Sequence, residues 1–245
     1  MESVGLAVAL ALSLASGDPF PGFAGVAWSL VAGTAGIVGL LAFYRALATG
    51  SMSLVAPVAA VVGAGLPVLA GYAFGERLAA GQVLGILAAL GAVALVSRPG
   101  VDEGGDDRGG IWLALFAGLG FAAYFVGMDR AIASGAGTWW PLPIARAASI
   151  VVTSIGLFAT GQAREVRRVV TPLVVVCGLG DTLGNLGFLA ARSVGTLGPA
   201  AVVASLYPAV TVVLAWLFLS ERLSRAHLAG VALAFAGIVL IALPG

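Results

Sequence analysis

LGPAAVVASLYPAVTVVLAWLFL, residues 197–219, contains no charged side chain, and Ser220-Glu221-Arg222-Leu223 follows it directly. An α-helix of about 20 apolar residues crosses the ~30 Å hydrocarbon core of a bilayer, and this stretch is long enough to do so. Eight other stretches of the chain are similarly apolar, and we predict nine apolar segments, at about 3–16, 24–48, 52–74, 79–97, 111–130, 139–161, 169–191, 197–219 and 223–243.

The composition indicates that the solvent of this protein is lipid. Hydrophobic residues make up 60% of the chain and charged residues 9%, with a mean hydropathy of +1.09, whereas soluble domains carry roughly 25% charged residues. A chain in lipid must form helices or a closed barrel. Barrel strands alternate apolar and polar residues over about ten positions, but these segments are continuously apolar. We therefore expect an all-α, polytopic transmembrane helix bundle with membrane lipids around it.

The two halves of the chain resemble each other. When residues 64–100 are laid on residues 209–245 without gaps, Glu76-Arg77-Leu78 matches Glu221-Arg222-Leu223. Duplicated halves are common in secondary transporters, which bind substrate near the midplane between the repeats. We predict a first repeat at 1–100 with four helices, a polar connector at 101–110, and a second repeat at 111–245 with five helices.

The first repeat is one helix shorter than the second. Segment 111–130 has no counterpart in the first half, and segment 3–16 is short for a membrane span. The simplest interpretation is a ten-helix plan that lacks its first helix, so that nine are present.

The repeated unit resembles the EamA domain of the drug/metabolite transporter superfamily. The matching residues are Ser205-Leu206-Tyr207-Pro208, then Ser220-Glu221-Arg222-Leu223, then a glycine-bearing helix. The first half has the same ending, Gly75-Glu76-Arg77-Leu78, but Gly63 stands at the position that matches Pro208. This resemblance covers essentially the whole chain. It implies two inverted five-helix repeats, a central cavity and transport of small organic solutes.

Ionisable residues inside apolar segments are the first candidates for a functional site, because each is costly in lipid. Asp181 lies in the middle of segment 169–191, and Asn185 follows one turn later on the same helix face. Asp181 could bind a cationic group, or a proton coupled to transport. Alternatively, it pairs with Arg146 of segment 139–161 and locks two helices together. The two interpretations are compatible if the pair opens during transport.

Tyr124, Ser205, Tyr207 and Pro208 are further candidates for the lining of a substrate cavity. Tyr124 lies deep in its segment, where its hydroxyl needs a partner, and this favours an inward-facing position. Pro208 lacks the N–H that would bond the carbonyl of Ala204, and freed backbone in a membrane is tolerated where it faces protein or water. The alternative for this proline is a packing kink that binds no ligand.

Two charged pairs are predicted to be structural, and a third is predicted to be solvated. Glu76-Arg77 and Glu221-Arg222 form the repeat motif, and each glutamate precedes a helix at a spacing that suits N-terminal capping. Asp129-Arg130 ends segment 111–130, where we expect a solvated pair at the membrane interface.

Enzyme chemistry is not expected. The single histidine, His227, and the single cysteine, Cys177, cannot form a metal cluster. A Walker loop is impossible because the chain has no lysine. We predict no catalytic residue, no metal, no cofactor and no nucleic-acid partner, and find no signal of an oligomeric state. A non-transporting membrane scaffold or sensor is the alternative to a transporter.

The expected location is the cytoplasmic (inner) membrane, crossed several times. Two criteria give opposite orientations. The positive-inside rule places the arginine-rich face in the cytoplasm, whereas the family pattern places the C-terminus and the arginine-poor face there. The arginine-poor face holds Arg77, Arg130 and Arg192; the other holds Arg45, Arg98, Arg108, Arg164, Arg167, Arg168, Arg222 and Arg225.

Overall fold

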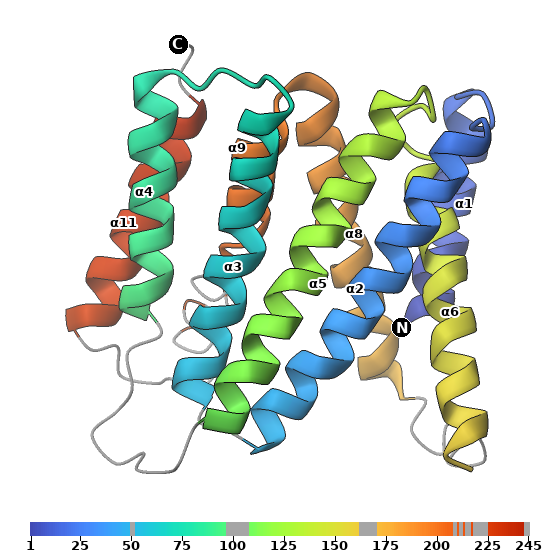
Figure 1. The fold of residues 1–245 in the computed structure, drawn as a ribbon, viewed down its shortest axis with the longest axis horizontal. Coiled ribbons are helices and arrows are strands. Elements are labelled where there is room, and N and C mark those ends of the chain that lie inside the picture. Colours follow the sequence, from blue (N-terminus) through green and yellow to red (C-terminus); the bar gives the residue numbers. More distant parts are fainter. Residues whose placement is uncertain are drawn as a thin grey trace. The chain divides into compact units, whose positions relative to one another are not determined.

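The computed structural model describes residues 1–49, 52–96, 108–161, 171–207, 210, 213, 217 and 225–242. This part of the chain is helical and contains no strand (Figure 1). The helices are α1 (Glu2–Ser16), α2 (Phe23–Thr49), α3 (Met52–Ala73), α4 (Ala80–Val96), α5 (Arg108–Ala133), α6 (Pro141–Ala159), α8 (Pro172–Val194), α9 (Leu197–Ala204) and α11 (Arg225–Ala242).

The predicted all-α bundle is confirmed. Among the described residues, four helices are long and apolar enough to cross a membrane: α2, α5, α6 and α8. The helix ends follow local chemistry. Pro141 and Pro172 begin α6 and α8, where the missing N–H of a proline costs nothing. Gly17 ends α1 with a left-handed φ of 74°.

Segment 197–219 is not one continuous helix. Helix α9 ends at Ala204, and the N–H of Ser205 donates to the carbonyls of Ala201 and Val202. The sequence accounts for an end at Ala204, because Pro208, four residues later, has no N–H to donate to the Ala204 carbonyl. Pro208 itself lies outside the described residues, as do Glu221 and Arg222.

The chain divides into two compact units, each of which contains parts of both predicted repeats. Unit 1 comprises Met1–Val38 and Ala123–Gly195, and unit 2 comprises Gly39–Ala122 and Thr196–Gly245. The predicted repeats at 1–100 and 111–245 are defined by duplicated sequence rather than by contacts, so they remain a prediction.

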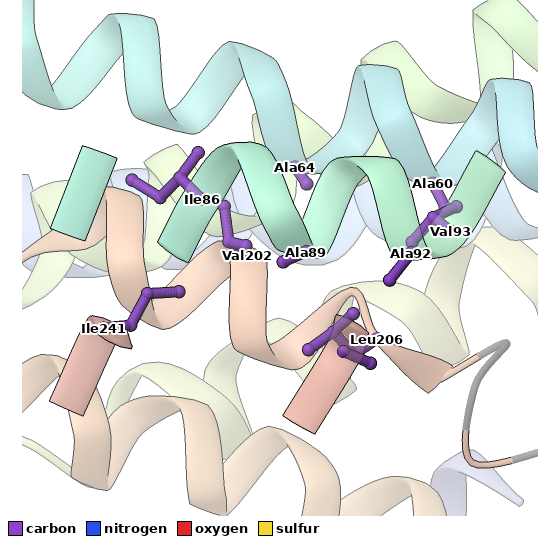
Figure 2. Close-up of a cluster of buried hydrophobic side chains, with 10 residues drawn as sticks. Ala60, Ala64, Ile86, Ala89, Ala92, Val93, Val202, Leu206 and Ile241 are labelled. Atoms are coloured by element: carbon purple, nitrogen blue, oxygen red, sulfur yellow. The ribbon is translucent and has the colours of Figure 1, made fainter. Parts of the chain in front are cut away.

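Small residues let the helices of unit 2 approach closely. A Cβ atom on Gly85 of α4 would lie 2.8 Å from the carbonyl oxygen of Gly237 on α11, and one on Gly237 would lie 2.9 Å from that of Gly85. Backbones therefore touch at this crossing, as is common between membrane helices. Figure 2 shows the core beside it, which α3, α4, α9 and α11 share, built from Ala60, Ala64, Ile86, Ala89, Ala92, Val93, Val202, Leu206, Ala234 and Ile241.

Glu76 caps a helix, but not the one that follows it in the chain. Its two carboxylate oxygens accept hydrogen bonds from the N–H groups of Leu197 (2.5 Å) and Gly198 (3.2 Å), at the start of α9. In the first turn of α4, the side-chain oxygen of Gln82 instead accepts the N–H of Ala79 at 3.1 Å. Glu76 therefore ties the α3–α4 connection to α9 within unit 2.

We expect Glu76→Gln to lower the free energy of unfolding by about 1–2 kcal/mol. A neutral amide has one acceptor oxygen in place of two and loses the attraction between a carboxylate and a helix N-terminus. Titration with sodium dodecyl sulfate in detergent micelles measures the change. The control is Arg77→Gln, because Arg77 is exposed and contacts the Tyr72 ring only at 5.9 Å. Equal stability of Glu76→Gln and the wild type would contradict the capping role.

In unit 1, α1 packs against α6 and α8, and Figure 1 shows α1 beside α6. Asp18, just after α1, holds the start of α6. Its carboxylate accepts the N–H groups of Thr138 (2.8 Å) and Trp139 (3.2 Å), and its carbonyl accepts the indole N–H of Trp140 at 2.9 Å. Gly137 makes room for this contact, since its φ is +64° and a Cβ there would lie 2.7 Å from the Asp18 carboxylate.

The prediction that Asp129 belongs to a solvated pair was wrong. Asp129 is fully buried and binds two arginines. Arg130 contacts one carboxylate oxygen through Nε (2.8 Å) and Nη2 (2.6 Å), and Arg192 of α8 pairs with the other. A buried carboxylate needs such partners. The position at a helix end suggested exposure, because the sequence does not show that α8 ends beside α5.

Candidate functional site

Three charged side chains from three helices of unit 1 meet in one cluster. Glu2 comes from α1, Arg146 from α6 and Asp181 from α8. Nη1 of Arg146 donates to both oxygens of Glu2, each at 2.9 Å. Nη2 of the same guanidinium pairs with Oδ2 of Asp181. The planar, forked guanidinium suits this double role, because it can serve two carboxylates at once. We name Glu2, Arg146, Asp181, Asn185 and Tyr124 the polar cluster.

A glycine allows α1 to reach the cluster. A Cβ atom on Gly5 would lie 2.6 Å from Oγ1 of Thr182 and 3.2 Å from Nε of Arg146. Thr182 is fully buried on α8, and its hydroxyl donates to the carbonyl of Gly178 at 2.7 Å. The backbone of α1 therefore lies directly against the guanidinium, one turn after Glu2.

Two neutral side chains extend the cluster. Asn185 lies one turn after Asp181 on α8, and its amide nitrogen donates to the Asp181 carbonyl (2.8 Å) and to Oδ1 of the Asp181 carboxylate (3.3 Å). The amide oxygen of Asn185 accepts the hydroxyl of Tyr124 from α5 at 2.6 Å. Tyr124 thus has the partner that a deep hydroxyl requires. This network also determines which way the amide points.

Exposure differs within the cluster. The side chain of Arg146 is 9% exposed and that of Glu2 is 19% exposed, whereas that of Asp181 is 44% exposed. Nε of Arg146 is buried and has no hydrogen-bond partner among the described residues. The Glu2 carboxylate is thus enclosed together with the guanidinium, and the Asp181 carboxylate is exposed on one side.

The predicted site residues fall into two groups. Tyr124, Arg146, Asp181 and Asn185 are brought together in unit 1. Ser205 and Tyr207 belong to unit 2, where Ser205 is buried and Tyr207 is partly exposed. A pocket of about 250 Å³ in unit 2 has a wholly apolar lining that includes neither Ser205 nor Tyr207; it consists of Leu206, Val210, Val213, Val231, Ala234, Phe235 and Ile238.

Sequence analysis missed Glu2. It stands just before the short apolar segment 3–16, and a charge at the edge of such a segment is normally interfacial. A signal was present, since a guanidinium inside a membrane segment, such as that of Arg146, requires acidic partners. Among the described residues, no group of three or more histidine, cysteine or acidic side chains could hold a metal ion.

Residues 108–243, more than half of the chain, match the EamA-like transporter family. The chain belongs to this family. The resemblance to EamA-type transporters seen in the sequence is therefore confirmed, and this EamA-like protein is a membrane transporter of the drug/metabolite type. Transport, rather than enzyme chemistry, is the activity of the family.

A solved crystal structure of a protein has the same fold. It superposes with a TM-score of 0.74 at 18% sequence identity, over 98% of the EamA-like chain and 84% of its own. At this identity the similarity concerns the fold alone. No match was found among curated protein sequences.

Proposed function

We propose that this EamA-like protein moves small organic solutes across the cytoplasmic membrane by alternating access, and that the polar cluster of unit 1 binds the solute or a coupled proton. The observation that carries the proposal is the half-exposed carboxylate of Asp181 inside a helix long enough to span the membrane. Membership of the EamA-like family supports transport in general. The polar cluster supports unit 1 as the place where the solute or proton binds.

The exposure of Asp181 favours water on its open side. A carboxylate facing lipid near the bilayer centre costs about 3 kcal/mol, and side chains of this kind almost always face the bundle interior or a water-filled cavity. Asn185 and the hydroxyl of Tyr124 lie on the same side, which adds polar groups that lipid would not solvate. A wet face in the interior is what a solute pathway requires.

The pair between Arg146 and Asp181 suits a site that changes during transport. A positive group arriving at Asp181 would compete with the guanidinium, and Glu2 would keep the guanidinium neutralised in the meantime. The sequence suggested either an ion pair that joins two helices or a carboxylate that binds a cation. These interpretations then describe the closed and the open state of the pair between Arg146 and Asp181. A proton gradient can drive the cycle if the arriving group is a proton.

Labelling of a cysteine beside Asp181 tests alternating access. The native Cys177 is exposed on α8 and is first replaced by serine. Gly184→Cys is then introduced, because Gly184 lies one turn from Asp181 and a Cβ there meets no atom within 4 Å. In sealed vesicles, a membrane-impermeant maleimide added from either side is expected to label this position, since each state opens the site to one side.

Leu183→Cys is the matched control. Leu183 is 65% exposed but lies about 200° around α8 from Asp181, on the face where we expect lipid, so the same reagent should leave it unlabelled. Labelling of Gly184→Cys from one side only would contradict alternating access. Labelling from neither side would favour the scaffold or sensor, whose interior is sealed.

A further inference from the structure

We propose that Glu2 is the permanent counter-ion of Arg146, and that it leaves Asp181 to hold one exchangeable positive charge, supplied by a proton or by the ammonium group of a small solute. This inference deepens the proposed function and rests on it. It concerns a residue that the sequence did not single out, and it states the charge of the ligand that the polar cluster would accept.

The contacts of the two carboxylates are unequal. Glu2 binds Arg146 with both oxygens at 2.9 Å and is 19% exposed. Asp181 uses only Oδ2 for the guanidinium and is 44% exposed. Breaking the Glu2 contact would leave an enclosed carboxylate without its cation, which is costly. Asp181 can exchange its partner at lower cost, because water reaches it.

If Asp181 moves, the guanidinium of Arg146 cannot move with it, because contacts with α1 hold the guanidinium beside Glu2. Its Nε side lies against Gly5, where even a methyl group would come within 3.2 Å of the nitrogen. Thr182 closes the same side, because a Cβ on Gly5 would also lie 2.6 Å from its hydroxyl oxygen. Arg146 is therefore held by α1 from two directions, through the Glu2 carboxylate and through the backbone at Gly5.

The charges of the polar cluster do not balance. Among its five side chains, Glu2 and Asp181 contribute two negative charges and Arg146 contributes one positive charge, which leaves these side chains with one negative charge. Tyr124 of α5 and Asn185 of α8 are neutral, and both belong to the hydrogen-bond network of Asp181. One monovalent cation would neutralise the cluster, and a second would not be favoured.

The open polar atoms are acceptors. The amide nitrogen of Asn185 is used by Asp181, and its oxygen is used by the hydroxyl of Tyr124. What remains available is the further lone pair of Asp181 Oδ1, beside its long bond from Asn185 at 3.3 Å, and the lone pairs of the Tyr124 oxygen. A group rich in N–H donors complements these atoms, and a primary ammonium has three such donors. A carboxylate would meet only acceptors and a net negative charge.

The test measures binding of two matched probes, benzylamine and benzoate, to the full chain in detergent micelles at neutral pH by isothermal titration calorimetry. Benzylamine is expected to bind the wild type, and benzoate is not. Asp181→Asn should abolish benzylamine binding, and Glu2→Gln should weaken it at least tenfold, because the whole charge of Arg146 then falls on Asp181. Glu2→Asp keeps the charge and should restore most of the affinity. Glu76→Gln removes a carboxylate from unit 2 and should leave the affinity unchanged.

The proton is followed by infrared spectroscopy on acidification. The charged and titratable groups around Asp181 are Arg146, Glu2, Tyr124 and the α-amino group of Met1, whose backbone packs against Gly178 of α8. The C=O band of the protonated cluster carboxyl should be absent in Asp181→Asn and present in Glu2→Gln. If this band pattern is observed but benzylamine does not bind, the exchangeable positive charge at Asp181 is a proton. Unchanged benzylamine affinity in Glu2→Gln, preferred binding of benzoate, or loss of the band in Glu2→Gln would overturn the proposal. Binding without two-sided labelling of Gly184→Cys would count against alternating access instead.

Discussion

Gly33→Ala is expected to destabilise unit 1 by about 3 kcal/mol, the upper end of the usual cost of overpacking. Gly33 lies on α2, and a Cβ there would overlap the Ala145 carbonyl oxygen and would lie 2.6 Å from its Cα. These are backbone atoms of α6, which cannot rotate out of the way as a side chain can. The hydroxyl of Ser149 also donates to the Gly33 carbonyl at 3.0 Å, and separating the helices would break this buried bond.

Gly156→Ala is the control for this change. Gly156 lies on α6 as well, but a Cβ there meets no atom within 4 Å. The same glycine-to-alanine substitution then tests helix propensity alone, which favours alanine by about 1 kcal/mol. Titration with sodium dodecyl sulfate should show a large loss of stability for Gly33→Ala and none for Gly156→Ala. Similar behaviour of the two variants would contradict the close crossing of α2 and α6.

Arg146→Leu is expected to cost about 3 kcal/mol of unfolding free energy, toward the lower end for a broken buried pair, because Asp181 is partly exposed. The substitution leaves Glu2 and Asp181 without their shared cation. It also removes the side chain that connects α1, α6 and α8, so we expect unit 1 to lose stability in the same unfolding titration.

Removal of the charges should reverse most of this loss. The triple variant Glu2→Gln, Arg146→Leu, Asp181→Asn contains no uncompensated charge, and buried ion pairs can often be replaced by neutral groups at little cost. Arg146→Lys should fall between the wild type and Arg146→Leu, because an ammonium keeps the charge but lacks the planar fork. If the triple variant is no more stable than Arg146→Leu, the loss does not arise from electrostatics.

Much of the polar cluster could be predicted from the sequence, because local rules placed its members. Asp181 and Asn185 are four residues apart and therefore share a helix face. Arg146 was expected to pair with Asp181, because charges inside membrane segments require partners. The same reasoning gave Tyr124 a hydrogen-bond partner. Each step needs only helix periodicity and the cost of leaving a polar group in lipid.

Glu2 and Asp129 show where that reasoning ends. Both stand at the edges of apolar segments, where a charged side chain is ordinarily solvated. Their surroundings depend on contacts with residues far along the chain: Glu2 with Arg146, and Asp129 with Arg192. The capping partner of Glu76 is similar, since it is α9 rather than the adjacent α4.

The sequence was sufficient to predict a membrane protein made of apolar helices. It also predicted where most of those helices begin and end, and which family the chain resembles. These properties follow from hydrophobic length, proline and glycine positions and duplicated motifs, all of which are local. Only the packing of the helices shows which charged side chains are enclosed and which are exposed. Glu2 is enclosed, whereas Asp181 is partly exposed. Burial depends on how closely helix backbones approach, and that distance depends on glycines such as Gly5 and Gly33 meeting partners that are remote in the chain.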